Sequence, residues 1–271
     1  MFQPVVPMGG YAGWAFLNRT LEKQETAFSR SPEIARDIAY FEKNIGSVNT
    51  AGELVNDRRL LKVALGAFGL GDDINSRAFI RKILEEGTLA PDALANRLAD
   101  KRYHAFSRAF GFGDLAVPAN KVSDFAGRIT ALYRERRFEA AIGEQDENMR
   151  LALNLRRDLA RIAEKGTSPD TKWYEIMGQP PLRKVFETAF GLPSSFATID
   201  IDKQLETFRE RAEKAFGSSE IGQFTDPEKR EELIRLFLLR ADIQAGATGS
   251  TGGQTALTLL QSATPPQPLN G

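Results

Sequence analysis

Few residues in this sequence have side chains that could do chemistry, and His104 is the first of them. It is the only histidine among 271 residues, and the chain contains no cysteine. An imidazole has a suitable intrinsic pKa for a general base, but no Gly-x-Ser-x-Gly nucleophile motif lies near it. A lone histidine also cannot supply the several imidazole or thiolate ligands of many metal sites. We therefore expect His104 to be a packing or helix-surface residue, and we assign no catalytic residue and no metal.

Acidic pairs and glycines offer two other kinds of site. Asp72-Asp73 and Asp200-Ile-Asp202 each precede a predicted helix and lack the alternating oxygens, central glycine and final glutamate of a calcium loop. The glycines between residues 66 and 71 are not part of a GxxxxGK[ST] loop. Helix capping and helix termination explain these residues, so we expect no cofactor.

Charge is balanced over the whole chain, with 36 basic and 36 acidic residues. Basic clusters occur at Arg58-Arg59, Lys101-Arg102, Arg134-Glu-Arg-Arg137 and Arg156-Arg157. Acidic residues are interleaved with them, whereas nucleic-acid-binding proteins concentrate positive charge on one face. Solvated helix faces are the expected role of the clusters, and nucleic acid is not an expected partner. Weak nucleic-acid binding stays an alternative, which predicts that the arginines from 134 to 157 share one exposed face.

An enzyme of unrecognised class that uses a carboxylate pocket is the other alternative. Paired carboxylates for acid and base catalysis leave no local signature in a sequence with 36 acidic residues. This alternative predicts a deep polar pocket that contains clustered carboxylates with perturbed pKa values, or His104 beside one.

The beginning of the chain is rich in glycine, proline and aromatic residues. It lacks a basic region followed by an apolar core, so we expect no secretion signal. No uncharged apolar run reaches the roughly 18 residues of a membrane span, which favours a soluble protein. We predict that residues 1–30 form a flexible arm whose aromatic residues dock onto another chain or onto the body, and homo-oligomers could form through it. The candidate docking residues are Phe2, Tyr11, Trp14 and Phe16.

A repeat is the strongest organisational signal. The sequence LLKVALGAFGL at residues 60–70 returns as LRKVFETAFGL at residues 182–192, with seven identical positions and an offset of 122. Self-similarity at fixed spacing indicates one supersecondary unit used twice. In the first copy the apolar residues fall on one face of a helix that Asn56 or Asp57 can cap and Gly69 can end.

Helical periodicity continues through most of the chain. Ser31 followed by Pro32 begins one amphipathic helix, and a single helix is expected from Pro91 to Phe110. Further helices are expected near residues 146–165, 181–190, 199–216 and 227–242. We therefore predict an all-α protein with repeat 1 at 31–117, a linking helix at 118–145, a diverged repeat 2 at 146–245 and a low-complexity tail at 246–271.

Three segments resemble one bacterial family. The stretch DRRLLKVALGAFGL at residues 57–70, RAFIRKIL at 77–84 and ANRLADKRY at 95–103 are similar to the family known as domain of unknown function 1217. The resemblance implies an alphaproteobacterial protein whose relatives are often encoded among flagellar genes, with no established activity. It implies a location in the cytoplasm or at the flagellar apparatus.

We predict a non-enzymatic helical scaffold or adaptor with a protein partner, which the resemblance suggests is flagellar. The second copy lacks the Asp-Arg-Arg lead and the Ala-Asn-Arg-Leu segment of the first, so a functional face is expected where only the first copy has these residues. The candidate interaction surface comprises Asp57, Arg58, Arg59, Asn96, Arg97, Asp100, Arg102 and Tyr103.

Overall fold

The computed structural model describes residues 2–248 and confirms the all-α class, since this part of the chain contains thirteen α-helices and no strand. The α-helices are α1 (Gly10–Ser29), α2 (Pro32–Asn44), α3 (Ala51–Asn56), α4 (Arg58–Ala67), α5 (Arg77–Glu86), α6 (Leu94–Arg97), α7 (Arg102–Phe110), α8 (Phe125–Gly143), α9 (Glu147–Ala163), α10 (Pro169–Met177), α11 (Pro180–Ala189), α12 (Ile201–Phe216) and α13 (Pro227–Thr248). Five 3-10 helices connect them: η1 (Ile45–Ser47), η2 (Gly71–Asn75), η3 (Ala119–Lys121), η4 (Ser194–Thr198) and η5 (Ile221–Thr225). Within residues 2–248, no helix combines the length and the apolar character that crossing a bilayer requires.

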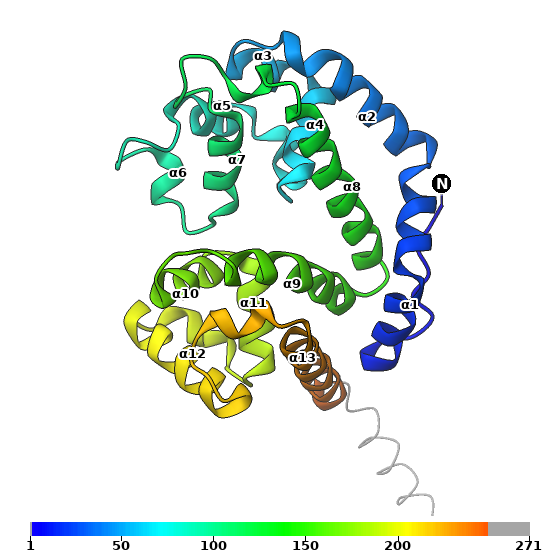
Figure 1. The fold of residues 1–271 in the computed structure, drawn as a ribbon, viewed down its shortest axis with the longest axis vertical. Coiled ribbons are helices and arrows are strands. Elements are labelled where there is room, and N and C mark those ends of the chain that lie inside the picture. Colours follow the sequence, from blue (N-terminus) through cyan, green and yellow to red (C-terminus); the bar gives the residue numbers. More distant parts are fainter. Residues whose placement is uncertain (1, 249–271) are drawn as a thin grey trace, which may run out of the picture.

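The helices form two lobes, which Figure 1 shows one above the other. The first lobe contains α2 to α8, with α4 packed on α8 and α2. The second lobe contains α9 to α13, with α9, α11 and α13 packed on one another. Helix α8 leads directly into α9 at the junction, and α1 runs along one side and contacts helices of both lobes.

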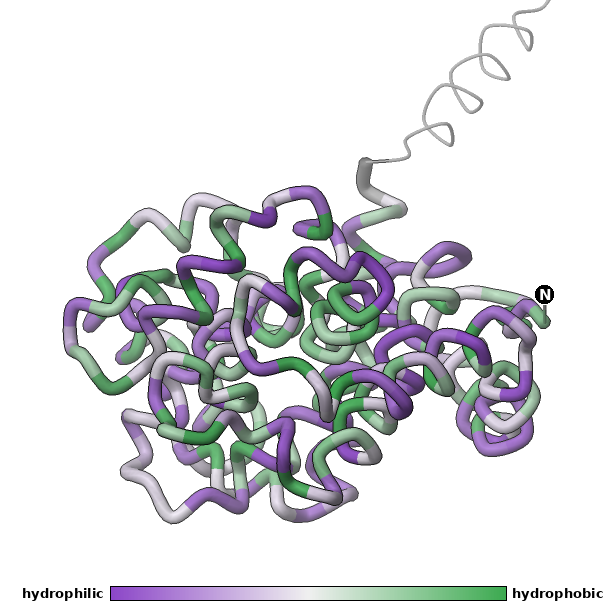
Figure 2. Tube along the Cα trace, turned by 90° about the horizontal axis from the view of Figure 1, so that it is seen from above, coloured by the Kyte–Doolittle hydropathy of each residue, from purple (hydrophilic) through white to green (hydrophobic). Residues whose placement is uncertain are grey.

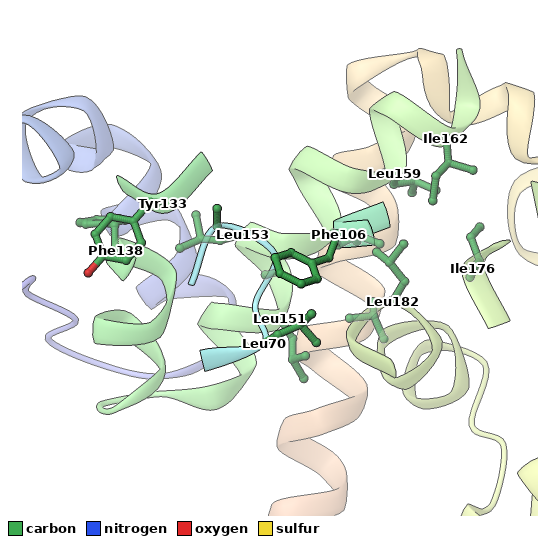
Figure 3. Packing of buried hydrophobic residues seen from close by; sticks show 14 of the residues in the cluster. Leu70, Phe106, Tyr133, Phe138, Leu151, Leu153, Leu159, Ile162, Ile176 and Leu182 are labelled. Atoms are coloured by element: carbon green, nitrogen blue, oxygen red, sulfur yellow. The ribbon is translucent and has the colours of Figure 1, made fainter. Parts of the chain in front are cut away.

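One continuous apolar core runs through both lobes and includes residues of α1. Figure 2 shows hydrophobic and hydrophilic residues alternating along the helical turns, as expected when each helix buries one face. Leu159, Ile176 and Leu182 project from α9, α10 and α11 in Figure 3, whereas Tyr133 and Phe138 project from α8. All five side chains are buried.

The repeated segment forms the same local structure twice. Both ends of α4 and α11 differ by the offset of 122 residues, and each helix is followed by a glycine with positive φ, Gly69 (+70°) and Gly191 (+66°). The amides of Leu70 and Leu192, one residue further on, donate to carbonyls five residues back, at 2.9 and 2.8 Å. These are the bonds of a Schellman helix end, which glycine favours because it lacks a Cβ. Duplication of the whole unit stays a prediction.

The N-terminal segment differs from the expected flexible arm, because residues 10–29 form the helix α1 on the body. Trp14 is fully buried, and its Nε1 donates to Glu231 of α13 at 2.8 Å. The amide of Val5 donates to Gln24 at 2.6 Å, which fixes the residues before the helix. Glycines and prolines at the start suggested a loop, but Trp14, Leu17 and the apolar residues after them have helical spacing, and their burial outweighs the local composition.

The single helix expected from Pro91 to Phe110 was also wrong, since it is divided into α6 and α7. The amide of Lys101 donates to the carbonyl of Gly178 in the second lobe at 2.8 Å. The amide of Arg102 donates to Asp100 at 3.0 Å, which begins a new helix. A contact between lobes thus replaces one helical hydrogen bond. At the other end of the chain, α13 continues to Thr248, and residues 249–271 of the predicted tail lie outside the described residues.

Candidate functional site

Two neighbouring cavities lie where the first lobe faces the second. The larger has a volume of about 910 Å³ and the smaller about 420 Å³. Arg102 of α7 and Arg136 of α8 line both of them. The two cavities are therefore parts of one cleft that α8 and α9 form at the junction of the lobes.

Positive charge dominates the larger cavity. Seven cationic side chains but only three carboxylates line it, although the whole chain has no net charge. Residues of α7, α8, α9 and α10 contribute. The cationic residues are Lys101, Arg102, Arg108, Arg136, Arg157, Arg161 and Lys165, and the acidic ones are Glu135, Asp158 and Glu175.

Apolar side chains form the rest of the larger cavity's wall. Phe68 follows α4, Ala105 and Ala109 lie on α7, and Leu132 lies on α8. Tyr174 of α10 adds an aromatic ring, 38% of which is exposed, and its hydroxyl donates to Asp202 at 2.8 Å. The cavity therefore offers both charge and apolar contact area.

The smaller cavity is lined mainly by α4, η2 and α8. Six cationic side chains and two carboxylates surround it, together with three glycines that carry no side chain into the space. The cationic residues are Arg58, Lys62, Arg102, Arg136, Arg137 and Arg150, the acidic ones are Asp72 and Glu139, and the glycines are Gly66, Gly69 and Gly71.

A buried group of four charged residues joins α8 to α9 beside both cavities. Arg136 contacts Asp158 at 3.0 Å and Glu139 at 3.5 Å, and Arg157 contacts Asp158 at 3.0 Å and also Glu139. No more than 17% of any of these side chains is exposed. Two cations facing two carboxylates neutralise one another, which is the usual condition for burying charge.

The two carboxylates of this group differ in their pKa values. Burial raises the pKa of Glu139 to about 7, and its two arginine neighbours only partly oppose this effect. Burial acts in the same direction on Asp158, but Arg136 and Arg157 outweigh it and lower the pKa to about 2. Asp158 is therefore the permanent anion of the group, whereas Glu139 titrates near neutral pH.

Other cations at the cavities have no carboxylate partner within residues 2–248. Arg108 is exposed and has neither an ion pair nor a hydrogen bond. The guanidinium of Arg58 donates only to the amide oxygen of Asn75, at 3.1 Å. Arg137 has no ion pair, and its Nε is buried without an acceptor. These arginines retain full charge that is available to a ligand.

His104 lines the larger cavity, whereas Glu139 lines the smaller one. Burial and the neighbouring Arg108 and Lys101 lower the pKa of His104, so its imidazole is neutral at neutral pH. The cleft therefore contains two carboxylates with shifted pKa values, Glu139 and Asp158, and Asp158 lines the larger cavity together with His104. The enzyme alternative stays a prediction. In the described part of the chain, no group of three or more histidine, aspartate or glutamate side chains could hold a metal ion.

The predicted interaction surface is divided among three places. Arg58 lines the smaller cavity, Asn96 the larger, and Arg102 both. Arg102 is held by Asp100 at 2.7 Å and donates to the carbonyl of Gly69 at 2.5 Å. These residues reach the cleft.

The remaining residues of that surface have other contacts. Asp57 caps α4 and accepts from the hydroxyl of Tyr40 at 2.8 Å, and Arg59 lies over the Tyr40 ring. The hydroxyl of Tyr103 donates to Asp73 at 2.7 Å, and burial together with this bond raises its pKa to about 12. Arg97 is exposed and lines neither cavity.

Two of the four candidate docking residues, Tyr11 and Trp14, contact the body of the same chain. Trp14 is buried, and the hydroxyl of Tyr11 donates to Glu231 at 3.1 Å. Phe16 is half-buried and Phe2 is 36% exposed. The sequence predicted that these aromatic residues dock onto another chain or onto the body. For Tyr11 and Trp14 the structure shows contact with the body.

The arginines from 134 to 157 do not share one exposed face. Arg136 and Arg157 belong to the buried charged group, and Arg137 lines the smaller cavity. Arg156 lies over the Trp14 ring, while Arg134 lines a separate hollow beside Glu25. The arrangement that the nucleic-acid alternative requires is therefore missing from this segment.

Sequence reasoning missed several residues of the larger cavity. Arg161, Lys165 and Tyr174 come from the second lobe, on which no functional face was expected. One signal was present, because Arg157, Arg161 and Lys165 follow at intervals of four on one helical face. Their position opposite α7 depends on how the lobes meet, which the spacing does not contain.

The comparisons with known proteins identify a family. Its sequence model, described as "Protein of unknown function (DUF1217)", matches residues 67–229, more than half of the chain. A crystal structure of a protein from Agrobacterium tumefaciens is similar, with a TM-score of 0.71 and 27% identity over 89% of this chain and 99% of that one. No curated protein matches. The matched residues include the second copy of the repeated helix and most of the cleft, and the chain belongs to the DUF1217 family.

Proposed function

We propose that this protein is a helical adaptor and that its larger cavity binds an acidic segment of a partner protein. The observation that supports this function is the excess of cations over carboxylates in an open cavity of a chain without net charge. Such local charge attracts acidic partners and discriminates against basic ones.

Several of these cations are free to pair with a partner. Arg108 has no partner in the described chain, and Arg161 is 55% exposed with both of its carboxylate contacts at 3.8 Å. Arginine forms paired hydrogen bonds with carboxylates, which adds geometry to attraction. Glutamate and aspartate side chains of an extended segment would meet these guanidinium groups.

The apolar wall completes the proposed surface. Leu132, Phe68 and the exposed part of Tyr174 lie among the cations. Interfaces combine an apolar centre with charged residues at the rim, and tyrosine and arginine are enriched in them. An acidic segment with a few apolar residues fits this arrangement better than a wholly charged one does. Because the family resemblance suggests a flagellar context, acidic flagellar proteins are the first partners to test.

Fluorescent decaglutamate tests the charge requirement directly. We expect the full-length chain to bind it with an affinity that falls as salt increases, and not to bind decalysine. The substitution Arg108→Glu should weaken binding at least about fivefold, since a pairwise charge interaction at an exposed site is worth up to about 1 kcal/mol and reversal makes it repulsive. Fluorescence anisotropy at two salt concentrations measures both effects.

The matched control is Arg211→Glu on α12, which reverses an exposed arginine outside the cavity. This variant should bind decaglutamate as the parent does. A protein partner captured by the parent should be lost with Arg108→Glu and retained with Arg211→Glu. Equal behaviour of the two variants, or binding that is insensitive to salt, would contradict an acidic partner in this cavity.

A further inference from the structure

The smaller cavity contains charge and hydrogen-bond donors that the adaptor function does not use. Arg58 and Arg137 line it but not the larger cavity, and neither has a carboxylate partner within residues 2–248. The Nε atoms of Arg136 and Arg137 are both buried without an acceptor. We propose that this cavity is a separate binding site for a small molecule that carries a phosphate group.

Hydrogen-bond energetics favour an anionic ligand at this place. A buried donor without an acceptor lowers the stability of the folded chain, and more so when the group is charged. The chain leaves two such donors on consecutive residues of α8, at the wall of one cavity. These Nε atoms are not accessible from the cavity, but the charge of an oxyanion in it would offset that of the unpaired arginines.

The geometry of the donors favours phosphate. A guanidinium presents parallel N–H groups that match two oxygens of a phosphate. Arg58 comes from α4 and Arg137 from α8, so a ligand in the cavity meets arginines of two helices. Gly69 and Gly71 form part of the wall, and a Cβ on Gly71 would meet no atom within 4 Å. Open space therefore exists beside the donors.

Volume and composition limit the rest of the ligand. A cavity of about 420 Å³ lies within the roughly 300–1,000 Å³ range of small-molecule sites. Ile74, Ala140 and Pro181 provide apolar contact. The ligand class is thus a phosphate ester with a compact carbon body, and a second macromolecule would be too large for this space.

The smaller cavity shares Arg102 and Arg136 with the larger one, but its other arginines allow it to be tested separately. Lys62, Arg102 and Arg150 each have a carboxylate partner, so the distinguishing charges are those of Arg58 and Arg137. Variants of these two residues test the smaller cavity alone. Arg108→Glu alters the larger cavity alone.

Isothermal titration of the full-length chain with pyrophosphate tests the proposal, with citrate as a carboxylate probe of high charge. We expect pyrophosphate to bind more tightly than citrate. Arg137→Gln should weaken pyrophosphate binding about tenfold or more, since a hydrogen bond to a charged group is worth about 1.5–3 kcal/mol. Arg58→Gln should also weaken it, and because Arg58 is exposed this variant keeps the fold intact.

Arg134→Gln is the matched control, because Arg134 lies on α8 but lines neither cavity. It should bind pyrophosphate normally, and Arg137→Gln should bind decaglutamate normally. No binding of pyrophosphate, stronger binding of citrate, or equal losses in Arg134→Gln and Arg58→Gln would overturn the phosphate site. Loss of decaglutamate binding with pyrophosphate binding retained would reject only the adaptor function.

Discussion

The two copies of the repeated helix are alike at their C-terminal ends and different at their N-terminal ends. Both α4 and α11 are followed by the sequence Phe-Gly-Leu, with the same pair of backbone hydrogen bonds around the glycine. Asp57 caps α4 by accepting from the amides of Arg59 and Leu60. Helix α11 begins with Pro180 and Pro181 after Gln179, whose side chain caps nothing.

The N-terminal ends of α4 and α11 deal with their unpaired backbone amides in different ways. The first amides of a helix have no helical acceptor. A capping carboxylate accepts from them, whereas proline removes a donor and already has the φ of a helix. The polar beginning leaves Arg58 pointing to a cavity, while the proline beginning places Pro181 at the edge of the same cavity.

The interior faces of the two helices differ as well. Ala64 of α4 corresponds to Phe186 of α11, and both are fully buried. Phe186 lies against four aromatic rings, whose centroids are 5.3–6.4 Å away. At Gly66, an added Cβ would come within 2.7 Å of the Tyr133 ring, whereas the second copy has Thr188 at this position. The small side chains of α4 thus allow α8 to pack closely against it. The larger side chains of α11 contribute instead to an aromatic core in the second lobe.

The largest expected effect tests this difference in the core. Phe186→Ala should lower the free energy of unfolding by about 3–5 kcal/mol, because it removes apolar contact and leaves a cavity. Urea unfolding of the full-length chain measures it. Phe2→Ala, which changes a partly exposed ring, should cost far less. Similar losses in the two variants would mean that the aromatic cluster does not stabilise the second lobe.

The next effect concerns the buried charged group between α8 and α9, at the junction of the two lobes. The pKa of Glu139 is about 7 in the folded chain, against about 4.3 for an unfolded glutamate. The folded state therefore binds more protons between these values, and stability falls as pH rises from about 4 to about 7, by at most about 1.4 kcal/mol per pH unit.

Glu139→Gln should flatten stability over that pH window, since the amide does not titrate. Urea unfolding midpoints at pH 5 and pH 7.5 measure the difference. Glu144→Gln, an exposed neighbour just after α8, should keep the pH dependence of the parent. If the stability of Glu139→Gln changed with pH as much as that of the parent, protonation of Glu139 would not be the cause of the pH dependence.

The smallest effect compares the two helix beginnings. Asp57→Ala should cost about 1–2 kcal/mol, because the amides of Arg59 and Leu60 and the hydroxyl of Tyr40 lose an acceptor. Gln179→Ala should cost less, since α11 has no side-chain cap. Urea unfolding measures the free energies of unfolding of both variants. Equal losses would contradict the view that a side chain caps the N-terminus of α4 but not that of α11.

The sequence predicted the elements that depend on local patterns. Asp57 as a cap, the apolar stripe after it and Gly69 at the end follow from neighbouring residues, and the structure confirms them. Helix α1 was missed because Pro4, Pro7 and Gly9 precede it and Gly10 begins it. Its stability comes from burying Trp14 against distant helices. Tertiary burial outweighed composition there.

The sequence predicted only some of the residues that line the cleft. Arg58 and Arg102 belonged to the predicted surface and do line the cavities. Arg108, Arg137 and Arg161 were not selected for it, because a balanced count of charges hides a local excess. That excess arises only when α7, α8 and α9 meet, and the division between α6 and α7 that helps to form it depends on the contact of Lys101 with Gly178.

The bond between Trp14 and Glu231 also has a consequence for synthesis of the chain. Its partners are separated by 217 residues, so a ribosome makes α1 long before the helix that receives it. Until α13 emerges, Trp14 has no partner for its indole N–H. Contacts over such separations are slow to form, and domains fold as units during synthesis. The first lobe can assemble early, but α1 can dock on α13 only after α13 has left the ribosome.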